Sequence, residues 1–169
     1  DSSNAWHLTG LGAGSVNAAV TFAGIEDLLG GALDDTFQFG SAGSLPGRID
    51  GAGGSDTLDY STYGQPALVN LATLAASGTG GFAHLERLVG SAAADTLTGT
   101  NTVNTWRLNG PVAGDFNGLF SFLGVENLVG GASMDSYQFG DLAEGFGTIH
   151  GGDGADNLNY SCVTSAVRV

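Results

Sequence analysis

The chain has 169 residues, of which 17 are Asp or Glu and four are Arg, with no Lys, so its formal net charge is -13. Nucleic acids and anionic membrane surfaces are bound through cationic patches, so this balance argues against both as partners. A hydrophobic fraction of 42% excludes a disordered acidic tail, and 30 glycines indicate many tight turns. The apolar runs are too short to insert into a membrane, no signal peptide is visible, and a single cysteine, Cys162, permits no intramolecular disulfide.

Short segments in which apolar and polar residues alternate recur along the chain. In chain order they are DTFQF (35–39), DTLDY (56–60), DTLTG (95–99), NTWRL (104–108), DSYQF (135–139) and DNLNY (156–160). Alternation with a period of two predicts short strands with one side facing a core. The Asp-x-apolar marker has weaker versions in GSVN at Ser15 and GDFN at Asp115, and one marker is missing beside VNLATL (69–74). The markers are spaced by about 20 residues, which predicts one turn and one strand for each coil of that length.

A longer repeat contains these markers. Shifted by 100 residues, positions 1–61 match positions 101–161 without a gap, and both copies carry a Trp, a QFG and a final NYS or DYS. A partial copy, FAHLERLVGSAAADTLTG (82–99), aligns with 22–39. Coils of this length cannot bury an apolar face alone and must stack on their neighbours. The sequence therefore predicts one domain, 1–169, with the fold of a parallel β-solenoid of about eight coils.

Stacked coils place equivalent apolar residues on top of one another. The expected ladders set Phe37 against Leu58, and Tyr137 against Leu158. Helical patterns are scarce, because the glycines of IEDLLGG (25–31) end any helical turn at once.

One segment, GGDGADNLN (151–159), fits every position of the nonapeptide G-G-x-G-x-D-x-U-x. GAGGSDTLD (51–59) lacks only the second glycine. On these residues the chain resembles the haemolysin-type (RTX) calcium-binding repeats and, more broadly, the Gly/Asp-rich solenoid repeats of large secreted bacterial surface proteins. The resemblance implies a right-handed coil, a secreted or cell-surface location in a bacterium, and calcium held between turns by aspartates and backbone carbonyls.

The resemblance and the stacking together define two candidate calcium sites. The predicted ligands of one are Asp35 and Asp56, and those of the other are Asp135, Asp153 and Asp156. Carboxylates on coils about 4.8 Å apart repel by about 1 to 3 kcal/mol, and a hard divalent cation reverses that sign. A second interpretation stays open, because aspartate is also favoured in turns, where its side chain bonds to nearby backbone amides.

No residue pattern indicates catalysis. Nearly every acid has a counterpart in another copy, and the three histidines, His7, His84 and His150, form no ligand pattern. The chain is therefore predicted not to be an enzyme.

The leading prediction is a non-catalytic structural or adhesive repeat module. The alternative is a carbohydrate-binding module, in which the aromatic residues Tyr63, Trp6 and Trp106 stack on sugar rings of a polysaccharide. The alternation of NTWRL favours a buried role for the tryptophans, which leaves Tyr63 as the better candidate for a surface contact, and both interpretations stay open. The expected protein partners are flanking solenoid coils or domains of a longer chain, and the open ends of a solenoid also allow end-to-end self-association.

Overall fold

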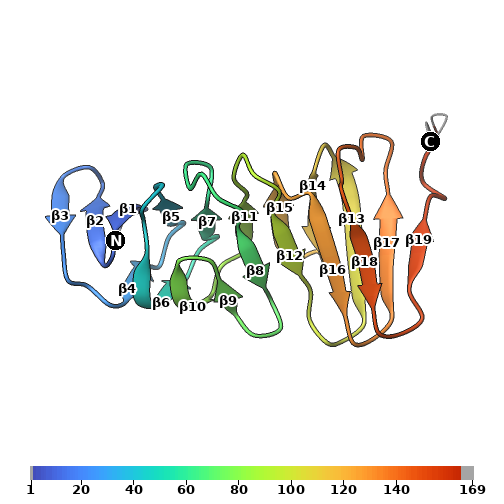
Figure 1. The fold of residues 1–169 in the computed structure, drawn as a ribbon, viewed down its shortest axis with the longest axis horizontal. Helices are drawn as coiled ribbons and strands as arrows, with labels where there is room; N and C mark the ends of the chain where they lie inside the picture. Colours follow the sequence, from blue (N-terminus) through green and yellow to red (C-terminus); the bar gives the residue numbers. More distant parts are fainter. Residues whose placement is uncertain (1, 165–169) are drawn as a thin grey trace.

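The computed structural model describes residues 2–164, and within that range every regular element is a β-strand. The molecule is elongated, with strands side by side along its long axis from β3 at one end to β19 at the other (Figure 1). No helix in the described range is long and apolar enough to cross a membrane.

One face of the molecule is a single long sheet with the strand order β19-β17-β13-β14-β15-β11-β7-β5-β1-β2-β3. Its strands are β1 (Ala5–Gly10), β2 (Ala13–Val16), β3 (Val20–Phe22), β5 (Thr36–Phe39), β7 (Thr57–Asp59), β11 (Arg87–Val89), β13 (Asn104–Gly110), β14 (Ala113–Phe116), β15 (Phe120–Leu123), β17 (Asp135–Phe139) and β19 (Asn157–Asn159).

The remaining strands form two smaller sheets, ordered β10-β6-β4 and β18-β16-β12-β8-β9. They are β4 (Leu28–Gly31), β6 (Leu45–Ala52), β8 (Leu68–Asn70), β9 (Ala75–Ala76), β10 (Thr79–Ala83), β12 (Thr96–Thr98), β16 (Asn127–Gly131) and β18 (Ile149–Gly152). Along much of the chain, successive strands alternate between the long sheet and a small one. The core consequently lies between the long sheet and the two small sheets.

Most strand pairs are parallel, and the predicted ladders are confirmed. Phe37 pairs with Leu58 between β5 and β7, and Tyr137 pairs with Leu158 between β17 and β19. The inward positions form one apolar cluster along the molecule, whose largest fully buried members include Trp106, Tyr60, Tyr137, Phe37 and Phe39. The predicted strands occur at all six expected segments, because a period-two pattern buries one side of a short strand.

Two markers were interpreted wrongly from the sequence. Ser15 and Asp115 do not begin new coils but lie in β2 and β14, the middle strands of the antiparallel meanders β1-β2-β3 and β13-β14-β15. The physical reason is a tight turn after each middle strand, with positive φ at Asn17 and Ala18 (53° and 51°) and at Asn117 and Gly118 (56° and 69°). Asn-Gly is the strongest short hairpin signal in a sequence, because a type I′ turn requires positive φ at both positions.

The two copies of the long repeat form equivalent strands with equivalent pairings. β1 pairs with β5 as β13 pairs with β17, and β5 pairs with β7 as β17 pairs with β19. The segment between them, residues 62–99, supplies β8 to β12, and its β11 joins β7 of the first copy to β15 of the second. We call residues 62–99 the connecting coil unit.

Candidate functional site

The Asp markers lie in lines along the turns between the sheets, and the carboxylates of four of them accept a backbone amide from the neighbouring repeat unit. The amide of Asn4 donates to Asp35 Oδ1 (2.5 Å), and the amide of Asp35 donates to Asp56 Oδ1 (2.6 Å). The amide of Asp56 then donates to Glu86 Oε2 (2.8 Å). Asp35 and Asp56 are each only 1% exposed. Carboxylate caps of this kind satisfy buried backbone donors, which would otherwise be costly.

The same arrangement occurs at two further places. Asp95 accepts the amide of Ala67 (2.6 Å), and its own amide donates to Glu126 Oε2 (2.9 Å). At the C-terminal end, Asp135 donates its amide to Asp156 Oδ1 (2.9 Å). We call these contacts the carboxylate ladders. An Asp or Glu of one repeat unit thus holds the turn of the unit before it.

Each aspartate of the ladders has a glycine five residues before it, and the structure explains this spacing. The pairs are Gly30 with Asp35, Gly51 with Asp56, Gly90 with Asp95, Gly130 with Asp135 and Gly151 with Asp156. A Cβ on any of these glycines would overlap the carboxylate of its aspartate. In four of the pairs it would also overlap a carbonyl oxygen of an adjacent segment. The spacing is therefore a packing requirement.

The nonapeptide at 151–159 is accounted for by the same geometry. Gly151 leaves room for the Asp156 carboxylate, whereas Gly152 (φ 99°) and Gly154 (φ 128°) have backbone angles that L side chains rarely adopt. A Cβ on Gly152 would also overlap the carbonyl oxygen of Gly131 on β16. All three glycines and the aspartate of the motif thus have structural roles that need no metal.

The predicted calcium ligands lie in the two expected groups, with Asp35 beside Asp56 and Asp135 beside Asp156. In the described range no group of three or more His, Cys, Asp or Glu side chains could hold a metal ion. Asp153 and Asp156 are exposed, whereas Asp35, Asp56 and Asp135 are buried in different coils. Calcium requires six to eight oxygen ligands, and here backbone N–H donors already occupy carboxylate oxygens. The arrangement fits turn capping better than a calcium site, and calcium binding stays a prediction.

Two buried carboxylates have an oxygen without a partner in the described structure. Oδ2 of Asp56 and Oδ2 of Asp135 are buried and accept no hydrogen bond. Burial raises the pKa of both carboxyl groups, with a further contribution from neighbouring carboxylates, Asp35 beside Asp56 and Asp156 beside Asp135. The ionised form of each is therefore less favourable in the folded chain than in the unfolded one.

This shift predicts a pH dependence of stability. A folded-state pKa above the unfolded value of 3.8 means that the contribution of Asp135 to stability is greatest below that value. It is lost as the pH rises through the folded-state pKa. Asp135→Asn removes the charge while keeping an oxygen that can accept from Nδ2 of Asn104 (2.6 Å). We expect this variant to unfold at a higher temperature than the natural chain at pH 7 and to lose the advantage near pH 4.

Thermal unfolding between pH 4 and pH 8 measures this effect. The control is Asp153→Asn, which removes an equal charge from an exposed side chain. Curves for Asp135→Asn and the natural chain that stay parallel over this range would contradict the expectation.

The predicted carbohydrate-binding aromatics are packed against the core. Trp106 is fully buried and stacks on Tyr137, with ring centroids 5.6 Å apart. Trp6 is partly buried and stacks on Phe37 in the same way. Tyr63 is partly buried and packs edge-on against Tyr60. Trp106 therefore offers no face to a sugar, as the alternation of NTWRL allowed, and Tyr63 offers only part of its ring.

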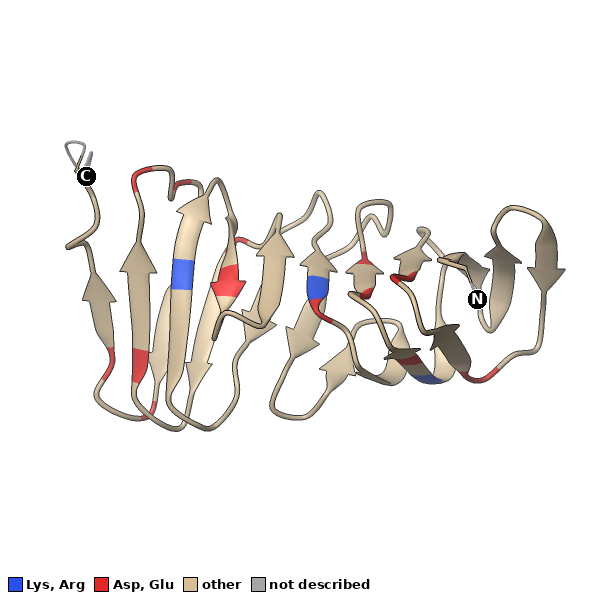
Figure 2. Cartoon of the chain, turned by 180° about the vertical axis from the view of Figure 1, so that it is seen from behind, with Lys and Arg blue, Asp and Glu red and all other residues tan. Residues whose placement is uncertain are grey.

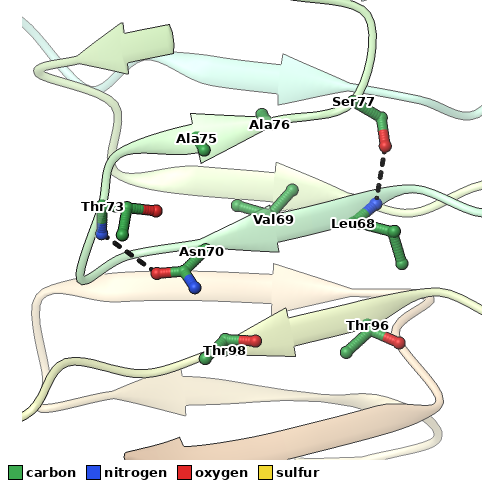
Figure 3. A pocket seen from close by; sticks show the side chains of 9 residues that line it. All are labelled: Leu68, Val69, Asn70, Thr73, Ala75, Ala76, Ser77, Thr96 and Thr98. Carbon is green, nitrogen blue, oxygen red and sulfur yellow. Dashed lines mark hydrogen bonds between the residues drawn. The ribbon is translucent and has the colours of Figure 1, made fainter.

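A shallow groove lies on the outer side of β8, β9 and β12 (Figure 3). Its volume is about 460 Å³, and its polar lining includes Asn70, Thr73, Ser77, Thr96 and Thr98. Asn70 and Ser77 already form hydrogen bonds within the groove wall. The side chain of Asn70 accepts the amide of Thr73 (3.0 Å), and that of Ser77 accepts the amide of Leu68 (2.9 Å). No aromatic ring lines this groove, so its surface offers hydroxyl and amide groups without a stacking platform.

The other charged side chains of the described residues are spread over the molecule (Figure 2). Acidic residues are distributed along the length of the molecule, and the few basic residues are separated from one another (Figure 2). In the described range the two ion pairs are His84 with Asp50 (2.7 Å) and Arg107 with Asp115 (3.1 Å), and they lie in different parts of the chain. Cys162 is exposed.

Comparisons of the chain with protein-family models, with curated proteins and with solved structures find no match in any of the three.

Sequence reasoning missed two members of the carboxylate ladders. Glu86 and Glu126 stand in LERLV and VENLV, and the signal that could have found them is the recurrence of Glu at equivalent positions of these segments. Asn104 was also missed, although it is 1% exposed and its side chain bridges Thr100 and Asp135. The signal for Asn104 was its repetition as Asn4 in the first copy.

Proposed function

We propose that this chain is a non-catalytic, right-handed β-solenoid repeat module with a structural or adhesive role in a bacterial protein that is secreted or held at the cell surface. One observation carries the proposal. The carboxylates of four Asp markers, Asp35, Asp56, Asp95 and Asp156, cap backbone amides, and that of Asp135 caps a side-chain amide, so these acidic residues serve the stacking of coils. For Asp135 the capped group is the amide side chain of Asn104, whose own backbone amide bonds to Met134.

The solenoid part of the proposal is supported by the parallel ladders and by the alternation of strands between the long sheet and the small ones. The two antiparallel meanders are insertions of two additional strands each into this pattern, and they widen the long sheet without ending the stack. The handedness of the coil and the extracellular location come from the resemblance to Gly/Asp-rich repeats. The strong negative charge agrees with a module that remains soluble and avoids anionic surfaces.

A carbohydrate-binding module is the second candidate, and the groove on β8, β9 and β12 is the observation that favours it. The hydroxyl groups of Thr96 and Thr98 face this groove from one strand, with the amide of Asn70 on the neighbouring strand (Figure 3). Sugar hydroxyls form hydrogen bonds with such groups. The missing aromatic platform makes a structural role the better supported of the two.

Retention on insoluble polysaccharides separates the two candidates. We expect the chain to stay in solution with cellulose, chitin and xylan, both in EDTA and with added calcium. Retention that is lost in Thr98→Ala or Tyr63→Ala, but not in Asp153→Ala, would instead establish a carbohydrate-binding module. Thermal unfolding of the same EDTA and calcium samples reports on the metal. A midpoint raised by several degrees with calcium would show that the calcium prediction from the nonapeptide is right despite the capping geometry.

A further inference from the structure

The two copies of the repeat differ sharply in the exposure of equivalent side chains. Leu58 is 1% exposed and Tyr60 is fully buried, whereas their equivalents Leu158 and Tyr160 are 57% and 43% exposed. The connecting coil unit, residues 62–99, makes the difference. Leu88 of β11 pairs with Leu58, and Tyr60 donates its hydroxyl to the carbonyl of Ser77 (2.6 Å). The edge formed by β18 and β19 therefore exposes apolar side chains that the first copy buries.

The opposite edge, formed by β3 and β4, shows the same contrast. Val20 and Ile25 are 60% and 37% exposed, whereas their equivalents Phe120 and Val125 are 7% and 0% exposed. The strands that cover this edge in the second copy are again those of the connecting coil unit. β11 pairs with β15, and β12 pairs with β16.

The polar groups at the two edges are equivalent to groups that the connecting coil unit binds inside the chain. Inside the chain the amide of Asp56 donates to Glu86, and the amide of Asp95 donates to Glu126, so the connecting coil unit contributes one carboxylate and one amide. The equivalents at the edges are the amide of Asp156 and the carboxylate of Glu26. Glu26 is exposed, and neither group has a side-chain partner in the described structure.

We propose that both edges are docking surfaces for a flanking coil of the same type as the connecting coil unit. Such a coil would cover Leu158 and Tyr160 with a Leu-Val strand like β11 and cap Asp156 with a glutamate placed like Glu86. At the other edge it would present an amide placed like that of Asp95 to Glu26. This inference rests on the proposed stacking of coils, and it names the partner that the stacking requires.

A second copy of the chain fits these edges less well. Its β3 is equivalent to β15, which pairs inside the chain with β11 and not with a strand of the β7 or β19 type. Glu26 precedes β4 of a small sheet, whereas Asp156 precedes β19 of the long sheet, so the two groups belong to different sheets. Head-to-tail docking of two copies therefore leaves both the amide of Asp156 and the carboxylate of Glu26 without their matching groups.

An extended chain tests the proposal. Residue Ser161 is equivalent to Ser61, so residues 1–161 followed by a second copy of 62–161 continue the repeat in register. Inside the natural chain the amide of Tyr60 donates to the carbonyl of Val89 (2.8 Å). We expect hydrogen exchange at the amide of Tyr160 to slow by ~100-fold in the extended chain and to approach the rate at Tyr60. Replacing the added copy of Glu86 by alanine is expected to restore fast exchange at the amide of Asp156.

The amides of Leu58 and Tyr60 serve as the internal control, because their protection shows that the first copy has folded in every variant. Protected amides there with fast exchange at Tyr160 would overturn the proposal. Sedimentation of the natural chain provides the second measurement. A concentration-dependent oligomer in which Tyr160 becomes protected would assign the edge to a second copy instead. Neither readout involves a polysaccharide, so a failure of docking is distinguishable from a failure of the structural function.

Discussion

Replacement of Trp106 by alanine is expected to lower the free energy of unfolding by about 3 to 5 kcal/mol, the usual range for deleting a buried large aromatic side chain. Trp106 is fully buried, and its ring contacts Phe116 edge-on (centroids 4.7 Å apart) as well as stacking on Tyr137. Alanine would leave a cavity between β13, β14 and β17. Because β13 and β17 are each held by pairing on both sides, little of that cavity can close by a local shift.

The repeat provides a matched control for this prediction. Trp6 is the equivalent residue of the first copy, but it is only partly buried and lies near the open N-terminal edge. We expect Trp6→Ala to cost clearly less than Trp106→Ala in urea unfolding monitored by circular dichroism. Equal losses would show that the core does not depend on coverage by the connecting coil unit. Retention of Trp106→Ala on a polysaccharide would be uninformative, because the residue has no exposed face.

Replacement of Asp95 by alanine is expected to cost about 3 to 5 kcal/mol, since it removes three hydrogen bonds at once and leaves their donors unsatisfied. The side chain is 1% exposed and accepts the amide of Ala67 (2.6 Å) together with the amide (2.5 Å) and hydroxyl (2.8 Å) of Ser91. An unsatisfied buried donor costs about 1 to 3 kcal/mol. The backbone amide of Asp95 keeps its bond to Glu126 in the variant, so only the side-chain contacts are lost.

Two further variants separate the effect of the lost hydrogen bonds on stability from the effect of the lost negative charge. Asp95→Asn keeps one acceptor oxygen and is expected to lose about half as much stability as Asp95→Ala. Asp153→Ala removes an exposed carboxylate with no side-chain contact of this kind, and we expect a change within about 0.5 kcal/mol. Urea unfolding of the three variants measures these changes in the free energy of unfolding. If Asp95→Ala proved as stable as the natural chain, the carboxylate ladders would not hold the coils together.

The glycines of the nonapeptide show how far a short sequence motif can be interpreted without the structure. The strict nonapeptide at 151–159 predicted a calcium-binding turn, whereas the structure assigns Gly151 to steric clearance for Asp156. The same residues satisfy both interpretations, because a tight turn beside a carboxylate is needed in either case. Sequence alone could not separate them, since the donors that occupy the carboxylates come from residues 21 to 31 positions away in the chain.

The sequence by itself determined the class of structure. Period-two alternation after each Asp marker, glycine turns and a gap-free internal repeat were sufficient to predict short, mostly parallel strands stacked in ladders such as Phe37 on Leu58. These features are local, and each coil carries them independently. Only the tertiary structure decided three further points. It placed β2 and β14 in antiparallel meanders, it set Glu86 in line with the aspartates, and it left Leu158 exposed where Leu58 is buried. The meanders follow from a local turn with positive φ, as at Asn117 and Gly118. The other two points share a physical reason, because each depends on which segment lies next along the sheets, and that neighbour is chosen by contacts between distant parts of the chain.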